Sequence, residues 1–237
     1  MAFGAAYYRQ GAPMSSQFFQ ELDRVRKELL TMGALVENAT RQAISGVVQR
    51  RLDLVDTVIN GDRKIDAYEN DIDHECHRIL ALYQPVAQDL RLIITVLKVN
   101  KELERMGDHA KSIARCVANI AEHDSLPAEG RLAQMSDRVL TMVKDALDAT
   151  VRNDAELAQQ VREADDAVDD DCDHIFAEMQ QAMQSGGSII AAGVALITVA
   201  RNLERIGDLA TNIAKDVIFL VKGTTVRHGG IRVDHSG

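Results

Sequence analysis

The chain has 237 residues, of which 46% are hydrophobic and only 4% aromatic, with no Trp and three Pro. This balance favours a helical protein over a β-sandwich or a barrel. The formal charge of -9 argues against nucleic acid as a partner, because an acidic surface repels the phosphate backbone.

Targeting and redox features of the sequence point to the cytoplasm. The start of the chain lacks the basic segment followed by an apolar stretch that marks a secretory leader. The most apolar run, residues 188–200, is too short to span a bilayer, so we expect a buried helix there and no membrane insertion. The cysteines have no C-x-x-C spacing and are expected to be reduced core residues: Cys76, Cys116 and Cys172.

Six helices are predicted in chain order, because apolar side chains recur at intervals of three and four residues. Their ranges are 15–50, 53–83, 88–122, 130–152, 154–184 and 188–222. The third of them has a heptad-like apolar seam, which consists of Val99, Leu103, Met106, Ala110, Ile113, Val117 and Ile120.

The second half of the chain repeats the first. The phrase "ELERMGDHA" at 102–110 returns as "NLERIGDLA" at 202–210, and the apolar seam returns in step in the sixth predicted helix. The second and fifth predicted helices match at an offset of 103 residues. The sequence therefore predicts an all-α protein made of two tandem, pseudo-symmetric, antiparallel three-helix bundles. These repeats are expected at 15–122 and 130–222, with flexible termini at 1–14 and 223–237.

Each copy of the repeated phrase carries a Glu and an Asp four residues apart, a spacing that puts both side chains on one face of a helix. In the first copy, helical geometry turns Glu104 and Asp108 away from the apolar seam. Glu204 and Asp208 are turned the same way in the second copy. We therefore expect both acid pairs to face outward rather than into the bundle.

Acids on the preceding helices are expected to complete each group. The second predicted helix carries a stripe of acids at Asp62, Asp66, Glu69 and Asp73, and the fifth carries a matching stripe at Asp165, Asp169 and Asp173. A packed antiparallel neighbour would bring each stripe beside the acid pair of its repeat. The glycine inside each phrase costs about 1 kcal/mol relative to Ala, and close approach of that neighbour is a physical reason for it. Four carboxylates are thus predicted to converge on the surface of each bundle.

Two interpretations of these groups stay open. Carboxylates repel one another unless a cation neutralises them, and all-oxygen sites suit Mg, Ca, Mn or iron, with Zn as a further option. The alternative is a solvated acidic face on which Glu104 pairs with Lys101 or Arg105. The duplication of the whole pattern, glycine included, favours the cation site.

Two stretches resemble the signature sequences of the PhoU family, the accessory regulators of bacterial phosphate-specific transport. They are "LERMGDHAKSIA" at 103–114 and "LERIGDLATNIA" at 203–214. Further stretches at 29–43, 76–91 and 212–223 match the family pattern in the same order. The resemblance therefore extends over nearly the whole chain.

The resemblance implies multinuclear metal clusters on the surface, with Fe, Mn, Mg or Zn as divalent or trivalent ions. The ligands that it implies are Asp62, Asp66, Glu104, Asp108, Asp165, Asp169, Glu204 and Asp208. The sequence also departs from the family pattern. Leu209 stands where the first copy has His109, and Lys101 and Lys215 are basic where many relatives have acids. We therefore expect the two sites to differ.

The resemblance also implies a role. A PhoU-like protein would be a cytoplasmic negative regulator and not an enzyme, restraining the phosphate-starvation response when phosphate is plentiful. It would act as a homodimer that contacts the ATPase subunit of the phosphate ABC transporter and a sensor histidine kinase. Two alternatives remain: a ferritin-like di-metal oxidoreductase, which requires acids facing into a four-helix core, and a helical scaffold whose acids bind no metal.

Overall fold

The computed structural model describes residues 16–123, 125–187 and 189–223, and within these ranges it consists of helices and short turns. The helices are α1 (Ser16–Gln49), α2 (Asp53–Tyr83), α3 (Ala87–Ile120), α4 (Glu129–Arg152), α5 (Ala155–Met183) and α6 (Ile189–Lys222). All six predicted helices are confirmed, with ends that differ from the prediction by at most two residues. The predicted flexible termini lie outside the described residues, apart from Gly223.

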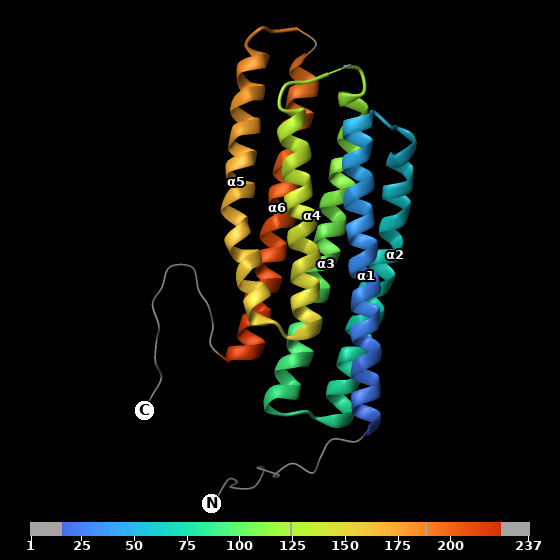
Figure 1. The fold of residues 1–237 in the computed structure, drawn as a ribbon. Helices are drawn as coiled ribbons and strands as arrows, with labels where there is room; N and C mark the ends of the chain where they lie inside the picture. The colour runs from blue at the N-terminus through green and yellow to red at the C-terminus, as the bar shows by residue number, and fades with distance from the viewer. Residues whose placement is uncertain (1–15, 124, 188, 224–237) are drawn as a thin grey trace, which may run out of the picture.

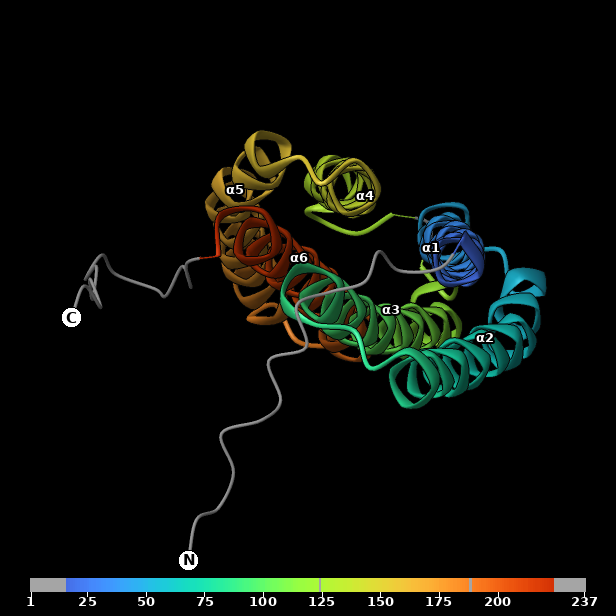
Figure 2. The same cartoon turned by 90° about the horizontal axis from the view of Figure 1, so that it is seen from below.

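The helices lie along one long axis in two layers (Figure 1). Viewed from the end, α5, α6, α3 and α2 form a curved row, and α4 and α1 cover its concave side (Figure 2). Within each half every helix packs against the other two, which confirms the predicted three-helix bundles. The contacts of α3 with α6 and of α1 with α4 join the two bundles into a single body.

The repeated apolar seams form the centre of this body. The seven predicted seam residues of α3 are each at most 1% exposed. Their counterparts in α6 are each at most 5% exposed, and they are Val199, Leu203, Ile206, Ala210, Ile213, Val217 and Leu220. One continuous hydrophobic core therefore runs through both halves, and it fixes which faces of α3 and α6 remain for function.

Local sequence determines where α4 ends and α5 begins. Asn153 adopts a left-handed conformation with φ of 52°, which Asn tolerates better than most residues. The Asp154 side chain then accepts hydrogen bonds from the backbone N–H groups of Glu156 and Leu157, each at 3.0 Å. Such an N-cap is worth about 1 kcal/mol. The resulting tight turn reverses the chain, so that α5 packs against both α4 and α6.

The apolar run at 188–200 enters the core at the start of α6, where Leu196 is fully buried. The predicted buried helix is confirmed for this face only, because Ile190 and Val194 are exposed. No helix in the described part of the chain is long and apolar enough to cross a membrane. Cys76 and Cys172 are buried as expected, whereas Cys116 is only partly buried, and all three thiols are free.

Candidate carboxylate clusters

The contact between α3 and α6 places the two repeated phrases side by side. His109 Nδ1 lies 2.9 Å from Asn202 Oδ1, and Lys98 pairs with Asp216 at 2.7 Å, so the two helices run antiparallel. The side chain of Asp108 is 54% exposed, as predicted for an outward-facing acid, whereas those of Glu104 and Glu204 are only 19% and 28% exposed. Both acid groups thus flank the α3–α6 contact near the middle of the molecule.

The glycines show which residues of α2 and α5 lie beside each phrase. A Cβ placed on Gly107 would lie 3.1 Å from Ile65 Cδ1 and 3.4 Å from Asp62 Oδ1. A Cβ on Gly207 would lie 3.5 Å from Val168 Cγ1 and 3.8 Å from Asp165 Oδ1. The same pair of positions therefore faces the glycine in both halves, which confirms the predicted offset of 103 residues between α2 and α5.

The two glycines predict different effects on stability. Gly207→Ala is expected to raise the free energy of unfolding by about 1 kcal/mol, because the new methyl group meets only ordinary contacts and Ala favours the helix. Gly107→Ala should raise the free energy of unfolding by less, because the Ile65 side chain must move to make room for the methyl group. Urea unfolding of both variants measures this difference. A loss of stability in Gly207→Ala would contradict it. Close approach thus explains Gly107, while the same explanation is wrong for Gly207.

In the first cluster a lysine takes the place between the carboxylates of two helices. The Lys111 ammonium forms ion pairs with Asp62 of α2 and, at 2.7 Å, with Asp108 of α3. Asp62 was expected at the surface, but its side chain is only 8% exposed because α3 packs over it. Burial raises the pKa of Asp66, and the charges of Asp62, Asp108 and nearby acids raise it further, so Asp66 belongs to the same group.

A second lysine neutralises the other end of the first cluster. Lys101 Nζ lies 2.8 Å from Glu104 Oε2 and 3.7 Å from Glu69 Oε1, so it also connects α3 with α2. The predicted alternative pairing of Glu104 with Lys101 is therefore confirmed. Arg105 pairs instead with Glu102, at 3.0 Å.

The second cluster contains the same carboxylates but has no lysine at the position equivalent to Lys111. Thr211 stands at the position equivalent to Lys111, one turn of α6 beyond Asp208. Burial raises the pKa of Asp165, and the charge of Asp208 raises it further, while the Thr211 side chain and Lys215 act in the opposite direction. Part of the repulsion between the carboxylates of α5 and α6 therefore remains.

Asp169 shows this remaining repulsion most clearly. Burial and the negative charges of Asp165, Glu204 and further acids raise its pKa to about 6. Glu204 Oε2 accepts a hydrogen bond from Cys172 Sγ at 3.2 Å, where the first cluster has Glu69 in place of a thiol. The Arg201 guanidinium lies farther from Glu204, at 3.9 Å. The second cluster is therefore less neutralised than the first.

The raised pKa of Asp169 predicts how stability depends on pH. The folded protein binds this proton more tightly than the unfolded chain, whose Asp pKa is 3.8. Its stabilising contribution is therefore fully present below pH 3.8 and is lost as the pH rises through about 6. In metal-free protein, Asp169→Asn should raise the melting temperature more at pH 7.5 than at pH 4. Equal increases in melting temperature at both pH values would show that the neighbouring carboxylates do not repel the Asp169 side chain.

The two clusters differ in the side chains that they offer to a cation. As the side chains stand, no three His, Cys, Asp or Glu residues within the described ranges are gathered to hold a metal ion. Carboxylates that repel one another stand apart, and side-chain rotation can bring them together around a cation. Carboxylate oxygens such as those of α5 and α6 are the donor type that hard divalent cations prefer. Those of α2 and α3 already hold an ammonium group.

Sequence reasoning missed Lys111 and Thr211, which determine this difference. The spacing could have revealed the pairing of Lys111 with Asp108. Lys111 follows Asp108 by three residues and so lies on the same face of the helix, one turn later. The pairing with Asp62, by contrast, depends on how α2 packs against α3. The sequence did not specify that packing in enough detail to find it.

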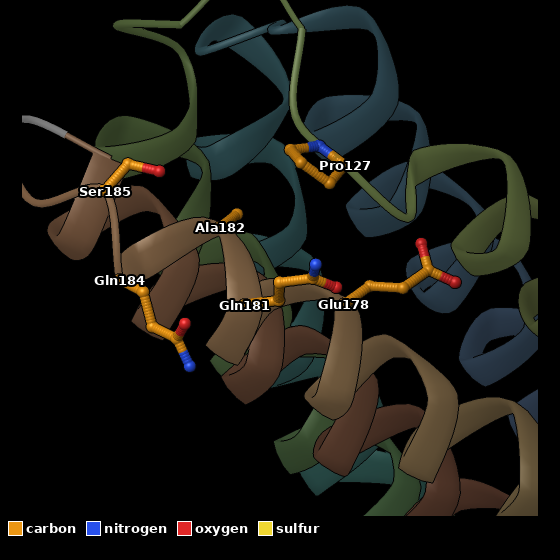
Figure 3. Close-up of a pocket in the computed structure, with 6 residues that line it drawn as sticks. All are labelled: Pro127, Glu178, Gln181, Ala182, Gln184 and Ser185. Atoms are coloured by element: carbon orange, nitrogen blue, oxygen red, sulfur yellow. The ribbon is translucent and has the colours of Figure 1, made fainter.

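A separate hollow of about 610 Å³ lies at the loop end of α5. Figure 3 shows its lining, which consists of Pro127, Glu178, Gln181, Ala182, Gln184 and Ser185. Glu178, the charged member of this set, is paired with Arg131 at 3.2 Å. None of the eight predicted ligands lines this hollow, so it is not part of the carboxylate clusters.

Two three-helix repeats that pack through a shared core, each with an equivalent group of acids, define the chain as a tandem-repeat helical protein. The PhoU domain family matches residues 29–117 and 132–217, one match in each repeat. The chain belongs to the PhoU family.

Individual relatives agree with this assignment. The chain is 41% identical over 220 residues to a phosphate-specific transport system accessory protein PhoU homolog of Pseudomonas putida, covering 92% of this chain and 86% of that protein. It is 34% identical over 222 residues to the accessory protein PhoU of Escherichia coli strain K12, covering 93% and 92% respectively.

Solved structures show the same fold. The crystal structure of PhoU from Pseudomonas aeruginosa is similar with a TM-score of 0.84 at 40% identity, covering 88% of this chain and all of that chain. The phosphate transport system regulatory protein PhoU from Streptococcus pneumoniae gives a TM-score of 0.83 at 29% identity, covering 90% of this chain and all of that chain.

Proposed function

We propose that this chain is a non-enzymatic negative regulator of phosphate uptake and of the phosphate-starvation response. The observation that carries the proposal is similarity over nearly the full length to relatives described as accessory proteins of the phosphate-specific transport system. In this proposal the protein acts in the cytoplasm as a homodimer. It contacts the ATPase subunit of the phosphate ABC transporter and a sensor histidine kinase.

Exposed apolar side chains support a role in protein contacts. Leu90 and Ile94 on α3 are 39% and 41% exposed, and the equivalent Ile190 and Val194 on α6 are 47% and 54% exposed. Because α3 and α6 are antiparallel, these two apolar pairs lie toward opposite ends of the molecule. Apolar surface that recurs at equivalent positions is available for a partner to cover.

The carboxylate clusters support metal binding as part of the same function. We propose Mn, Fe, Mg or Zn as the bound ion, held by acids of adjacent helices on the outer face. The exposure of Asp108 disfavours the ferritin-like alternative, because such oxidoreductases need acids that face into a four-helix core. A metal-free scaffold would show no rise in melting temperature with any of these ions, whereas a ligand that binds the folded state raises it.

Deletion of the gene tests the regulatory role. In phosphate-rich medium the deletion strain is expected to express a phosphate-starvation reporter such as alkaline phosphatase at a high level. The intact gene supplied on a plasmid should return expression to a low level. An unchanged reporter in a strain without a second copy of the gene would overturn the proposal.

A further inference from the structure

We infer that a divalent cation binds the second carboxylate cluster and not the first, because the ammonium of Lys111 holds in the first cluster the position that a cation takes in the second. This inference rests on the metal binding proposed above, which it restricts to one repeat. The two clusters are defined by their acids. The first consists of Asp62, Asp66, Glu104 and Asp108, and the second of Asp165, Asp169, Glu204 and Asp208.

Lys111 shows where positive charge is held between two helices of this fold. Its ammonium is bound by Asp62 from α2 and by Asp108 from α3, which is how a cation between these helices would be bound. The Lys111 side chain is only 20% exposed, so the packing around it holds it in place. A lysine ammonium is a compact point charge, and a metal ion entering this cluster would have to displace it.

Thr211 leaves the equivalent position in the second cluster without a positive charge. The residue is 3% exposed, and its side chain faces Asp165. Its hydroxyl nevertheless makes no hydrogen bond of normal geometry with the described residues. A buried hydroxyl without a full partner carries an energetic cost, which a cation or its bound water can relieve.

The other basic groups near the second cluster stand at positions different from that of Lys111. Arg201 lies on α6, as does Glu204, and it approaches that carboxylate only to 3.9 Å. Lys215 lies a full helical turn beyond Thr211, so it does not stand at the position equivalent to Lys111. Negative charge in excess of positive charge is the condition under which carboxylates bind a divalent cation.

Matched pairs of variants test where the cation binds. The purified full-length protein is titrated with Mn²⁺, and the electron paramagnetic resonance signal of free aqueous Mn²⁺ reports how much is bound. Asp165→Asn with Asp169→Asn should abolish tight binding. Asp62→Asn with Asp66→Asn should leave it unchanged. Loss of binding in the first-cluster variant, or its retention in the second-cluster variant, would overturn the inference.

Exchange of the two distinguishing residues tests the role of the lysine directly. Lys111→Thr is expected to add Mn²⁺ binding in the first cluster, so that the amount bound per chain increases. Thr211→Lys is expected to remove Mn²⁺ binding from the second cluster. No additional binding in a folded Lys111→Thr protein would overturn the assignment to Lys111.

Controls separate this inference from the proposals on which it rests. Circular dichroism shows whether each variant folds, and the Asp-to-Asn pairs test the same assignment if Thr211→Lys does not fold. A wild-type protein that binds no Mn²⁺ overturns the inference. The regulatory role would still stand or fall on the reporter assay, which does not depend on the titration.

Discussion

Leu103→Ala is expected to lower the free energy of unfolding by about 2–5 kcal/mol, the usual range for removing a leucine side chain from a well-packed core. Leu103 is fully buried in the seam of α3, where this helix meets α1, α2 and α6. Those three neighbours cannot all close on the cavity, so the loss should lie well inside this range. Urea unfolding, monitored by helical circular dichroism, gives the value directly.

Matched substitutions test whether the effect comes from the seam. Leu203→Ala should lower the free energy of unfolding by a similar amount, because Leu203 is the equivalent residue of α6 and is also fully buried. Leu90→Ala, at a position that is 39% exposed on α3, should cost clearly less. Similar losses in Leu90→Ala and Leu103→Ala would contradict the assignment of the seam as the shared core.

Lys111→Met is expected to lower the free energy of unfolding of metal-free protein by about 1–3 kcal/mol, because a buried charged group then loses its partner. The change leaves Asp62, with a side chain only 8% exposed, without its ion pair across the helices. Methionine retains much of the apolar stem of lysine, so the loss of charge dominates over the loss of packing. Unfolding in urea with a chelator present measures the effect.

The surface ion pair of Lys98 provides the control. Lys98 is 52% exposed and binds Asp216 at 2.7 Å, so Lys98→Met should cost no more than about 1 kcal/mol. The larger loss should therefore occur in Lys111→Met. A loss in Lys111→Met no larger than that in Lys98→Met would show that Asp62 does not depend on Lys111.

The helices and their pairing could be predicted from the sequence because a duplicated seam constrains both. The seam of α3, from Val99 to Ile120, fixes the buried face of that helix, and its repetition in α6 showed that two equivalent units exist. The offset between α2 and α5 came from acid and apolar positions alone. It agrees with the neighbours of Gly107 and Gly207 in space.

The charge balance of the clusters could not be predicted in the same way. Helical spacing placed Glu104 and Asp108 on one face, but it did not reveal that Lys111 reaches across to Asp62. The burial of Asp62 depends on how closely α2 and α3 approach each other, and Gly107 gave only an indirect indication of that distance. Side-chain contacts between helices are set by packing, which a single-helix pattern does not contain.

The difference between the clusters gives the two repeats different roles in the proposed regulator. The first repeat holds its acids together with its own lysines, so its outer face is complete without a metal. If the second repeat binds a cation, as inferred above, the surface formed by α5 and α6 would change with metal occupancy. A partner that contacts this surface would then recognise the metal-bound form.

A reporter assay with the cluster variants tests most directly whether this chain represses the starvation response through its second cluster. A strain without the gene receives either Asp62→Asn with Asp66→Asn or Asp165→Asn with Asp169→Asn, and immunoblots confirm equal protein levels. We expect the first-cluster variant to restore a low reporter level in phosphate-rich medium and the second-cluster variant to leave it high. Full repression by the second-cluster variant would show that repression does not depend on this cluster.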